Sequence, residues 1–194
     1  MELLMKKKEK VLLIRGGTIA SGHRVGISYP DILSSRLSEK NIAVINRSRK
    51  GENSFDAVWT FDEDISPFDP DILLFNYGID DAFFPVYRSE FKENLVQVIR
   101  KSRAKADPEI ILLTSHIFPN QYDMNAVEIY YQAIREVASD LQCTMLPIHT
   151  IIAGHLIEQG IKIEDIILDD DRYLNERGHA LFAGIIIHHL EKLY

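Results

Sequence analysis

A hydroxyl residue, Thr18, stands where a buried strand would end. The stretch VLLIRGGTIASG, residues 11–22, starts with an apolar run and continues with a glycine pair, Thr18 and another glycine. The run predicts a strand of a parallel sheet, and the glycines let the backbone come close to a ligand above it. Ligands of open α/β sheets bind at such carboxyl ends of strands. Thr18 therefore lies at a candidate ligand-binding edge, and the turn lacks both common glycine-rich phosphate-binding patterns.

Four further residues are expected near this turn. Gly51 lies in a polar loop after the second predicted strand, and Asp80 follows the third. Asp170 and Tyr173 come shortly before the predicted final helix. Because the carboxyl ends of parallel strands meet at one edge of a sheet, we expect Gly51, Asp80 and Tyr173 to converge on Thr18.

An acyl-transfer site would also need a base for the Thr18 hydroxyl and a carboxylate to orient that base. His116, in LLTSHIFP, follows the fourth predicted strand and so reaches the same edge. It is a candidate substitute base, and its other reading is a loop histidine bonded to backbone or water. No metal site is predicted: the adjacent pair His188 and His189 faces two directions on the last helix, and the run 169–171 suits a solvated loop.

The Thr18 turn and the Gly51 loop resemble the first two blocks of the SGNH (GDSL-like) hydrolase family. Gly16, Gly17 and Thr18 stand where that family has Gly, Asp or Gly, and its nucleophilic serine. Gly51 stands where a glycine N–H of the family binds the oxyanion. GGTIAS also resembles the signature of bacterial-type asparaginases, but Arg15 occupies the position of their threonine nucleophile and no second motif of that family is present.

The last two blocks of the resemblance follow in order. GIDD keeps Gly78 and Asp81 of the family's GxND motif but has Asp80 in place of the asparagine. DDRYLNERGHALFA keeps Asp170 of the DxxH motif but has Tyr173 in place of the histidine. The four blocks run from Val11 to Ala183, nearly the whole chain. The fourth block also keeps the family's usual continuation: Leu174, Asn175, Gly178 and His179.

Three replacements bear on the chemistry that the resemblance implies. Thr18 keeps a hydroxyl and adds a methyl group. Tyr173 is a phenol with a pKa near ~10, which stays protonated at neutral pH and does not act as an imidazole does. An ionised Asp80 accepts hydrogen bonds and repels an oxyanion, and loss of one oxyanion donor typically costs about 10²–10³ in rate.

The resemblance and its replacements together predict a family member that is impaired or inactive as an ester hydrolase, a pseudoenzyme. It would retain a pocket for a small polar ligand, a sugar or acyl ester, lined by Thr18, Gly51, Asp80, Asp170 and Tyr173. The alternative is an active esterase or acetylhydrolase that uses Thr18 as nucleophile with an unorthodox base such as His116, supported by Asp170. No cofactor is implied by either hypothesis.

Alternating strand and helix patterns predict the fold class. We expect an α/β fold with a doubly wound, mostly parallel five-stranded sheet between helices, the three-layer sandwich of SGNH hydrolases and flavodoxin-like proteins, as a single domain over residues 1–194. The strands are expected at 11–14, 41–46, 72–75, 110–114 and 144–148, and the main helices from about 29, at 90–103, 125–141 and 175–190.

Composition narrows the partners. The formal net charge of −7 argues against nucleic acid, and no stretch approaches the ~20 apolar residues of a membrane span. The single Cys143 cannot form an internal disulfide, and the apolar run after the first lysines is too short for a signal peptide. We therefore expect a cytoplasmic protein with a small-molecule ligand or ester substrate and no nucleic acid or membrane partner; nothing indicates the oligomeric state.

Overall fold

One five-stranded sheet forms the centre of the protein. The computed structural model describes residues 9–84 and 86–193. All four strand pairings are parallel, and the order β2-β1-β3-β4-β5 is that of doubly wound flavodoxin-like sheets. The predicted fold class is thereby confirmed. The strands are β1 (Lys10–Gly16), β2 (Ile42–Asn46), β3 (Ile72–Asn76), β4 (Glu109–Leu113) and β5 (Thr144–Leu146).

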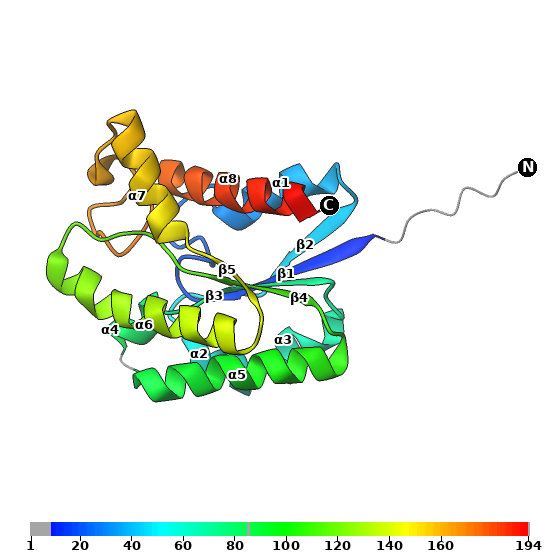
Figure 1. Cartoon of the computed structure of the whole chain (residues 1–194). Helices are drawn as coiled ribbons and strands as arrows, with labels where there is room; N and C mark the ends of the chain where they lie inside the picture. The colour runs from blue at the N-terminus through cyan, green and yellow to red at the C-terminus, as the bar shows by residue number, and fades with distance from the viewer. Residues whose placement is uncertain (1–8, 85, 194) are drawn as a thin grey trace, which may run out of the picture.

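Helices cover both faces of the sheet (Figure 1). On one face α1 (Tyr29–Ser38) packs against α8 (Glu176–Leu193), and on the other α5 (Arg88–Lys105) packs against α6 (Gln121–Asp140). Because both faces are covered, the strands are apolar almost throughout, and every residue of β3 is buried. The shorter elements are α2 (Ser54–Trp59), α3 (Phe61–Asp64), α4 (Ile79–Phe83) and two 3-10 turns, Ser66–Phe68 and Ile163–Asp165.

Local sequence signals explain where several helices begin. Asn53 caps α2, because its side-chain oxygen accepts the N–H of Phe55 at 3.0 Å while Asp56 accepts the N–H of Asn53 at 2.8 Å. Asn120 caps α6 in the same way through the N–H of Tyr122. These caps also fix the direction in which each helix leaves the preceding loop.

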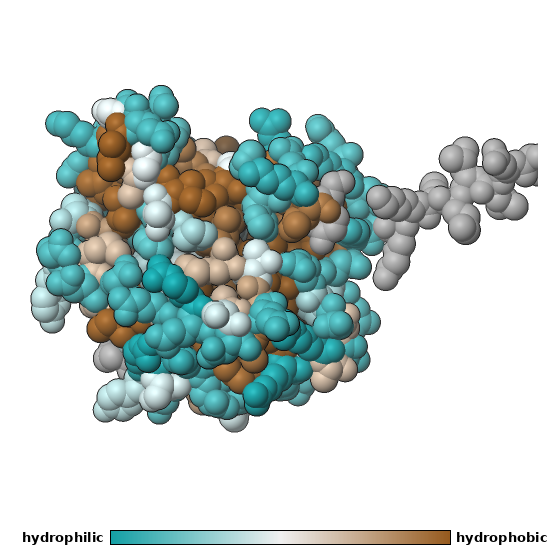
Figure 2. Space-filling view, viewed as in Figure 1, coloured by the Kyte–Doolittle hydropathy of each residue, from teal (hydrophilic) through white to brown (hydrophobic). Residues whose placement is uncertain are grey.

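The region after β5 differs from the sequence-based expectation. The strand expected at 144–148 ends at Leu146, and α7 (Ile148–Gln159) begins directly after Pro147. This helix was not predicted, because IHTIIAGHLIEQ is apolar on most sides and shows little periodicity. Figure 2 shows apolar side chains gathered over α7 and α8, where Ile157 is exposed. Within residues 9–84 and 86–193, no helix is both long and apolar enough to cross a membrane.

Candidate active site

The turn after β1 holds Thr18 at the carboxyl edge of the sheet, between the loops that follow β2 and β3. Thr18 is only 4% exposed. Gly17 precedes it, and a Cβ atom there would lie 2.0 Å from Asp80 Oδ2 and 2.3 Å from the carbonyl oxygen of Glu52. The three loops therefore meet in van der Waals contact at a position that only glycine can occupy.

Asp80 binds both polar groups of Thr18. Its Oδ2 accepts the backbone N–H of Thr18 at 2.7 Å, and its Oδ1 accepts the Thr18 hydroxyl at 2.5 Å. Thr18 Oγ1 in turn accepts the backbone N–H of Gly51 at 2.9 Å. Burial raises the pKa of Asp80, and the hydrogen bonds from Thr18 oppose that rise. The structure thus joins Thr18, Gly51 and Asp80, and the backbone N–H groups of Thr18 and Gly51 already have acceptors.

Asp81 has a supporting role that the sequence did not indicate. Its Oδ1 accepts the N–H of Ser54, the first residue of α2, and its Oδ2 accepts the N–H of Gly78 at the start of α4, both at 2.9 Å. The carboxyl is fully buried, and burial raises its pKa to about 6. Asp81 therefore ties the loop that carries Asp80 to the start of α2.

His116, the candidate substitute base, is fully buried below this edge. Its Nδ1 lies 3.2 Å from Ser115 Oγ and its Nε2 lies 3.1 Å from the carbonyl oxygen of Asp171. Burial lowers its pKa to about 4. Among the described residues, no histidine nitrogen is hydrogen-bonded to the Thr18 hydroxyl.

The loop before α8 brings Tyr173 to the same edge but directs Asp170 elsewhere. The Tyr173 ring packs edge-on against the His23 ring, with the ring centroids 5.3 Å apart. The backbone N–H of His23 donates to the carbonyl oxygen of Thr18 at 3.5 Å. Both Asp170 oxygens accept hydrogen bonds from the Arg172 guanidinium, at 2.9 and 2.8 Å. Those bonds lower the pKa of Asp170. The Asp170 carboxylate thus pairs with a cation two residues away.

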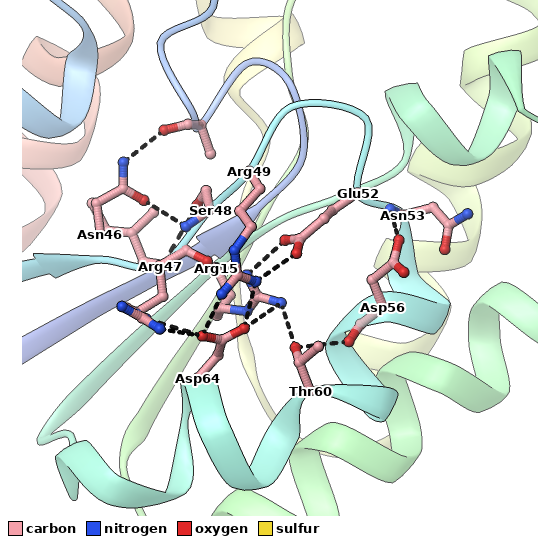
Figure 3. Close-up of polar contacts among 12 residues, drawn as sticks. Arg15, Asn46, Arg47, Ser48, Arg49, Glu52, Asn53, Asp56, Thr60 and Asp64 are labelled. Atoms are coloured by element: carbon pink, nitrogen blue, oxygen red, sulfur yellow. Dashed lines mark hydrogen bonds and ion pairs between the residues drawn. The ribbon is translucent and has the colours of Figure 1, made fainter.

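A buried arginine of β1 supports the loop that carries Gly51 (Figure 3). Arg15 is completely buried, and its Nη1 donates to the Glu52 carboxylate at 2.7 Å and to the carbonyl oxygen of Arg47. Its Nη2 donates to Thr60 Oγ1 at 2.9 Å. Arg15 therefore holds both ends of the 47–52 loop, which the sequence did not indicate because every partner is more than thirty residues away.

Asp64 closes this network from below, as Figure 3 shows. It pairs with Arg47 at 2.7 Å and Arg49 at 2.6 Å, and lies 3.6 Å from Arg15. Burial alone would raise the pKa of Asp64, but hydrogen bonds from Arg49 and Arg47 outweigh it and hold the pKa well below its usual range. The network combines three guanidinium groups with two carboxylates under the Gly51 loop.

Little empty space remains behind Thr18. The cavity beside Asp80, which reaches Asn76 and Ser115, holds about 10 Å³, room for one water at most. A larger groove of about 500 Å³ lies outside it, between the segments 24–26 and 168–177. In the part of the chain that the structure describes, no three His, Cys, Asp or Glu side chains are grouped closely enough to hold a metal ion.

Comparison with known families agrees with this arrangement. The model of the GDSL-like lipase/acylhydrolase family matches residues 15–181, and the chain belongs to that family. The predicted family is thereby confirmed. No protein among the curated sequences matches the chain.

Solved structures share the fold at low sequence identity. One is a catalytic mutant of Axe2, an acetylxylan esterase from Geobacillus stearothermophilus, with 17% identity, a TM-score of 0.80 and 95% of each chain covered. Another is LAE5, an alpha/beta hydrolase enzyme from the metagenome of Lake Arreo in Spain, with 19% identity and a TM-score of 0.78. That match covers 92% of this chain and 94% of the other. At such identities the likeness concerns the fold alone.

Proposed function

We propose that this GDSL-family protein is impaired as an ester hydrolase and keeps the Thr18 edge as a recognition site for a small polar ligand, a sugar or acyl ester. The contact between Asp80 and Thr18 carries the proposal. The Asp80 carboxylate accepts both the backbone N–H and the hydroxyl of Thr18. An oxyanion formed there would need hydrogen-bond donors and would be repelled by a negative charge.

The second support is the missing imidazole. Tyr173 stands at the expected position of the base, and both nitrogens of His116 face other partners. A hydroxyl without a base is a weak nucleophile at neutral pH. Asp80 and Tyr173 are the two replacements expected to slow acyl transfer most. On this proposal they act together at one edge of the sheet.

The groove lined by residues 24–26, 168 and 175–177 supports the ligand part of the proposal, because it is large enough for a small molecule and its Arg24 lies over the Tyr173 ring. A structural neighbour, Axe2, is an acetylxylan esterase, which makes an acetylated sugar a suitable probe. We expect acetylated xylotriose to bind measurably by isothermal titration calorimetry and to remain intact. Absence of binding would contradict the recognition role.

Hydrolysis of p-nitrophenyl acetate tests the impairment. The wild-type rate should exceed that of Thr18→Ala by little or nothing, with folding of both proteins checked by circular dichroism. Thr18→Ala also breaks two hydrogen bonds, so Thr18→Ser serves as the variant that keeps the hydroxyl. A wild-type rate that collapses in Thr18→Ala but not in Thr18→Ser would overturn the impairment.

One observation favours the second candidate, an active esterase. The Thr18 hydroxyl donates to Asp80 at 2.5 Å, so a carboxylate stands ready to take its proton during attack. In that case Asp80→Asn would abolish hydrolysis and His116→Gln would leave most of it. If hydrolysis is impaired, neither substitution changes a rate already near background.

A further inference from the structure

A second groove lies between the N-terminal ends of α2 and α5. It encloses about 580 Å³ and is lined by two phenylalanines, two glutamates and two asparagines. The lining residues that carry the following argument are Phe55, Phe84, Glu90, Glu93, Asn53 and Asn94. The volume suits a small molecule.

Aromatic rings are unusually exposed around this groove. Phe55 is 55% exposed and Phe84 64% exposed. Trp59, one turn along α2 and 79% exposed, stacks on Phe55 with ring centroids 6.3 Å apart and planes at 18°. Single exposed apolar side chains are common on proteins, whereas a cluster of them is typical of a binding site.

The charge at the groove is negative. Glu90 accepts the N–H of Tyr87 at 3.3 Å and Glu93 accepts from Gln97 at 3.2 Å, but neither forms an ion pair within the described residues. The two cations in the first turns of the same helix, Arg88 and Lys92, pair with Glu136 on α6 instead. No lysine or arginine is among the residues that line the groove.

Each asparagine of the groove has one side-chain atom engaged by a neighbour. Asn53 Oδ1 already accepts the N–H of Phe55, and Asn94 Nδ2 donates to Ser54 Oγ at 3.0 Å. Exposed aromatic faces and unpaired carboxylate charge are the features that distinguish the groove, and the ligand group that interacts with both is a cation with apolar substituents.

We propose that this groove binds a small organic cation that carries an alkylated ammonium group. The ammonium contacts the ring faces of Phe55 and Phe84, and Glu90 and Glu93 supply the opposite charge. This inference goes beyond the proposed function and involves no turnover, and the Thr18 side chain is hydrogen-bonded to Asp80 and Gly51 rather than to residues of this groove.

Choline titrated into the full-length protein tests the proposal. Trp59 is the only tryptophan of the chain, so its fluorescence reports on the groove, and isothermal titration calorimetry provides a second signal. The neutral isostere 3,3-dimethylbutan-1-ol separates charge from shape, and sodium chloride keeps the ionic strength constant. We expect saturable choline binding in the millimolar range, about fivefold or more tighter than the alcohol.

Variants assign the binding to this groove. Glu90→Gln with Glu93→Gln should weaken choline at least about tenfold, because both opposite charges are removed without loss of volume. Phe84→Leu should weaken it about fivefold. Glu158→Gln, on the exposed surface of α7, is the matched control and should have no effect.

Three outcomes would overturn the proposal. They are no saturable choline response in either measurement, equal affinity for choline and the alcohol, and unchanged choline affinity in the folded double variant. Each is independent of ester hydrolysis, so the proposed function and this inference fail separately.

Discussion

Two halves of the candidate site use their carboxylates in different ways. In the Thr18 half, formed by Thr18, Gly51 and Asp80, the carboxylate accepts two hydrogen bonds from the nucleophile position. In the Asp170 half, formed by Asp170, Arg172 and Tyr173, the carboxylate pairs with a neighbouring guanidinium. The first half is assembled around the hydroxyl, and the second contributes a ring to the edge but no base. The two halves thus differ in whether their carboxylate faces the Thr18 hydroxyl.

The network below the Gly51 loop should give the largest effect. Asp64→Asn leaves Arg15, Arg47 and Arg49 short of one buried opposite charge, and we expect a loss of about 3–5 kcal/mol in the free energy of unfolding. Urea denaturation measures it. Glu191→Gln, which breaks the exposed pair with Lys40, is the matched control and should change the free energy of unfolding little, because water screens that pair.

The same pair of proteins gives a pH test. The pKa of Asp64 is lowered on folding, so its stabilising contribution is complete above the unfolded pKa of about 4 and declines as the pH falls further. The stability difference between wild type and Asp64→Asn should therefore shrink below about pH 4. A difference that stays constant there would contradict the role assigned to the three arginines.

Joining the two halves is the next test. The triple change Thr18→Ser, Asp80→Asn and Tyr173→His restores nucleophile, oxyanion donor and base together. We expect p-nitrophenyl acetate hydrolysis to rise about 10²-fold above wild type, with single changes doing little because the groups act as a unit.

Arg172 should limit that gain, because it holds Asp170 away from the new imidazole. Adding Arg172→Met to the triple change should raise the rate further. A folded quadruple variant no faster than wild type would show that the two halves do not meet in a catalytic geometry.

Asp81 tests whether the Thr18 half depends on its neighbour. Asp81→Asn keeps one hydrogen-bond acceptor and loses the other. We therefore expect the free energy of unfolding, measured by urea denaturation, to fall by about 1–3 kcal/mol. Folding raises the pKa of Asp81 to about 6, so the wild-type contribution is complete below about pH 4 and is lost as the pH rises through 6. The cost of the substitution should accordingly be largest near pH 4 and smaller at pH 8. The opposite trend would mean that Asp81 is stabilised as a carboxylate.

The smallest effect is expected in the Asp170 half. Arg172→Met alone removes a partly exposed ion pair, which should change the free energy of unfolding by less than about 1 kcal/mol. Thermal or urea denaturation against wild type checks this. A loss comparable to that of Asp64→Asn would mean that the Asp170 half is as firmly built as the Thr18 half.

The sequence predicted the sheet well because its strands are buried on both faces and read as apolar runs between polar loops. The helix α7 escaped prediction because its exposed face is also apolar, with Ile157 82% exposed, so periodicity gave no contrast. The positions of Thr18, Gly51 and Asp80 at one edge followed from strand order. Their hydrogen bonds could not be predicted, since side-chain direction depends on contacts between distant loops.

Arg15 illustrates the same limit. In the sequence it marked only where one resemblance failed, and an arginine inside a strand of a parallel sheet has no local partner. The pairing with Glu52 and Asp64 exists because β1 and β2 lie side by side and the loop after β2 folds back over them. Residue types alone gave its charge and not its neighbours.

The absence of a side chain at Gly17 determines which substitutions the chain tolerates at this position. A Cβ atom there would overlap both Asp80 and the backbone at Glu52, so a substitution at position 17 is penalised by residues encoded far away. Shortening Asp80 to alanine removes one of the two overlaps and should make Gly17→Ala less harmful than it is alone, a coupling that a double-mutant cycle would measure. A larger side chain at position 17 therefore requires that Asp80 and the loop after β2 change first.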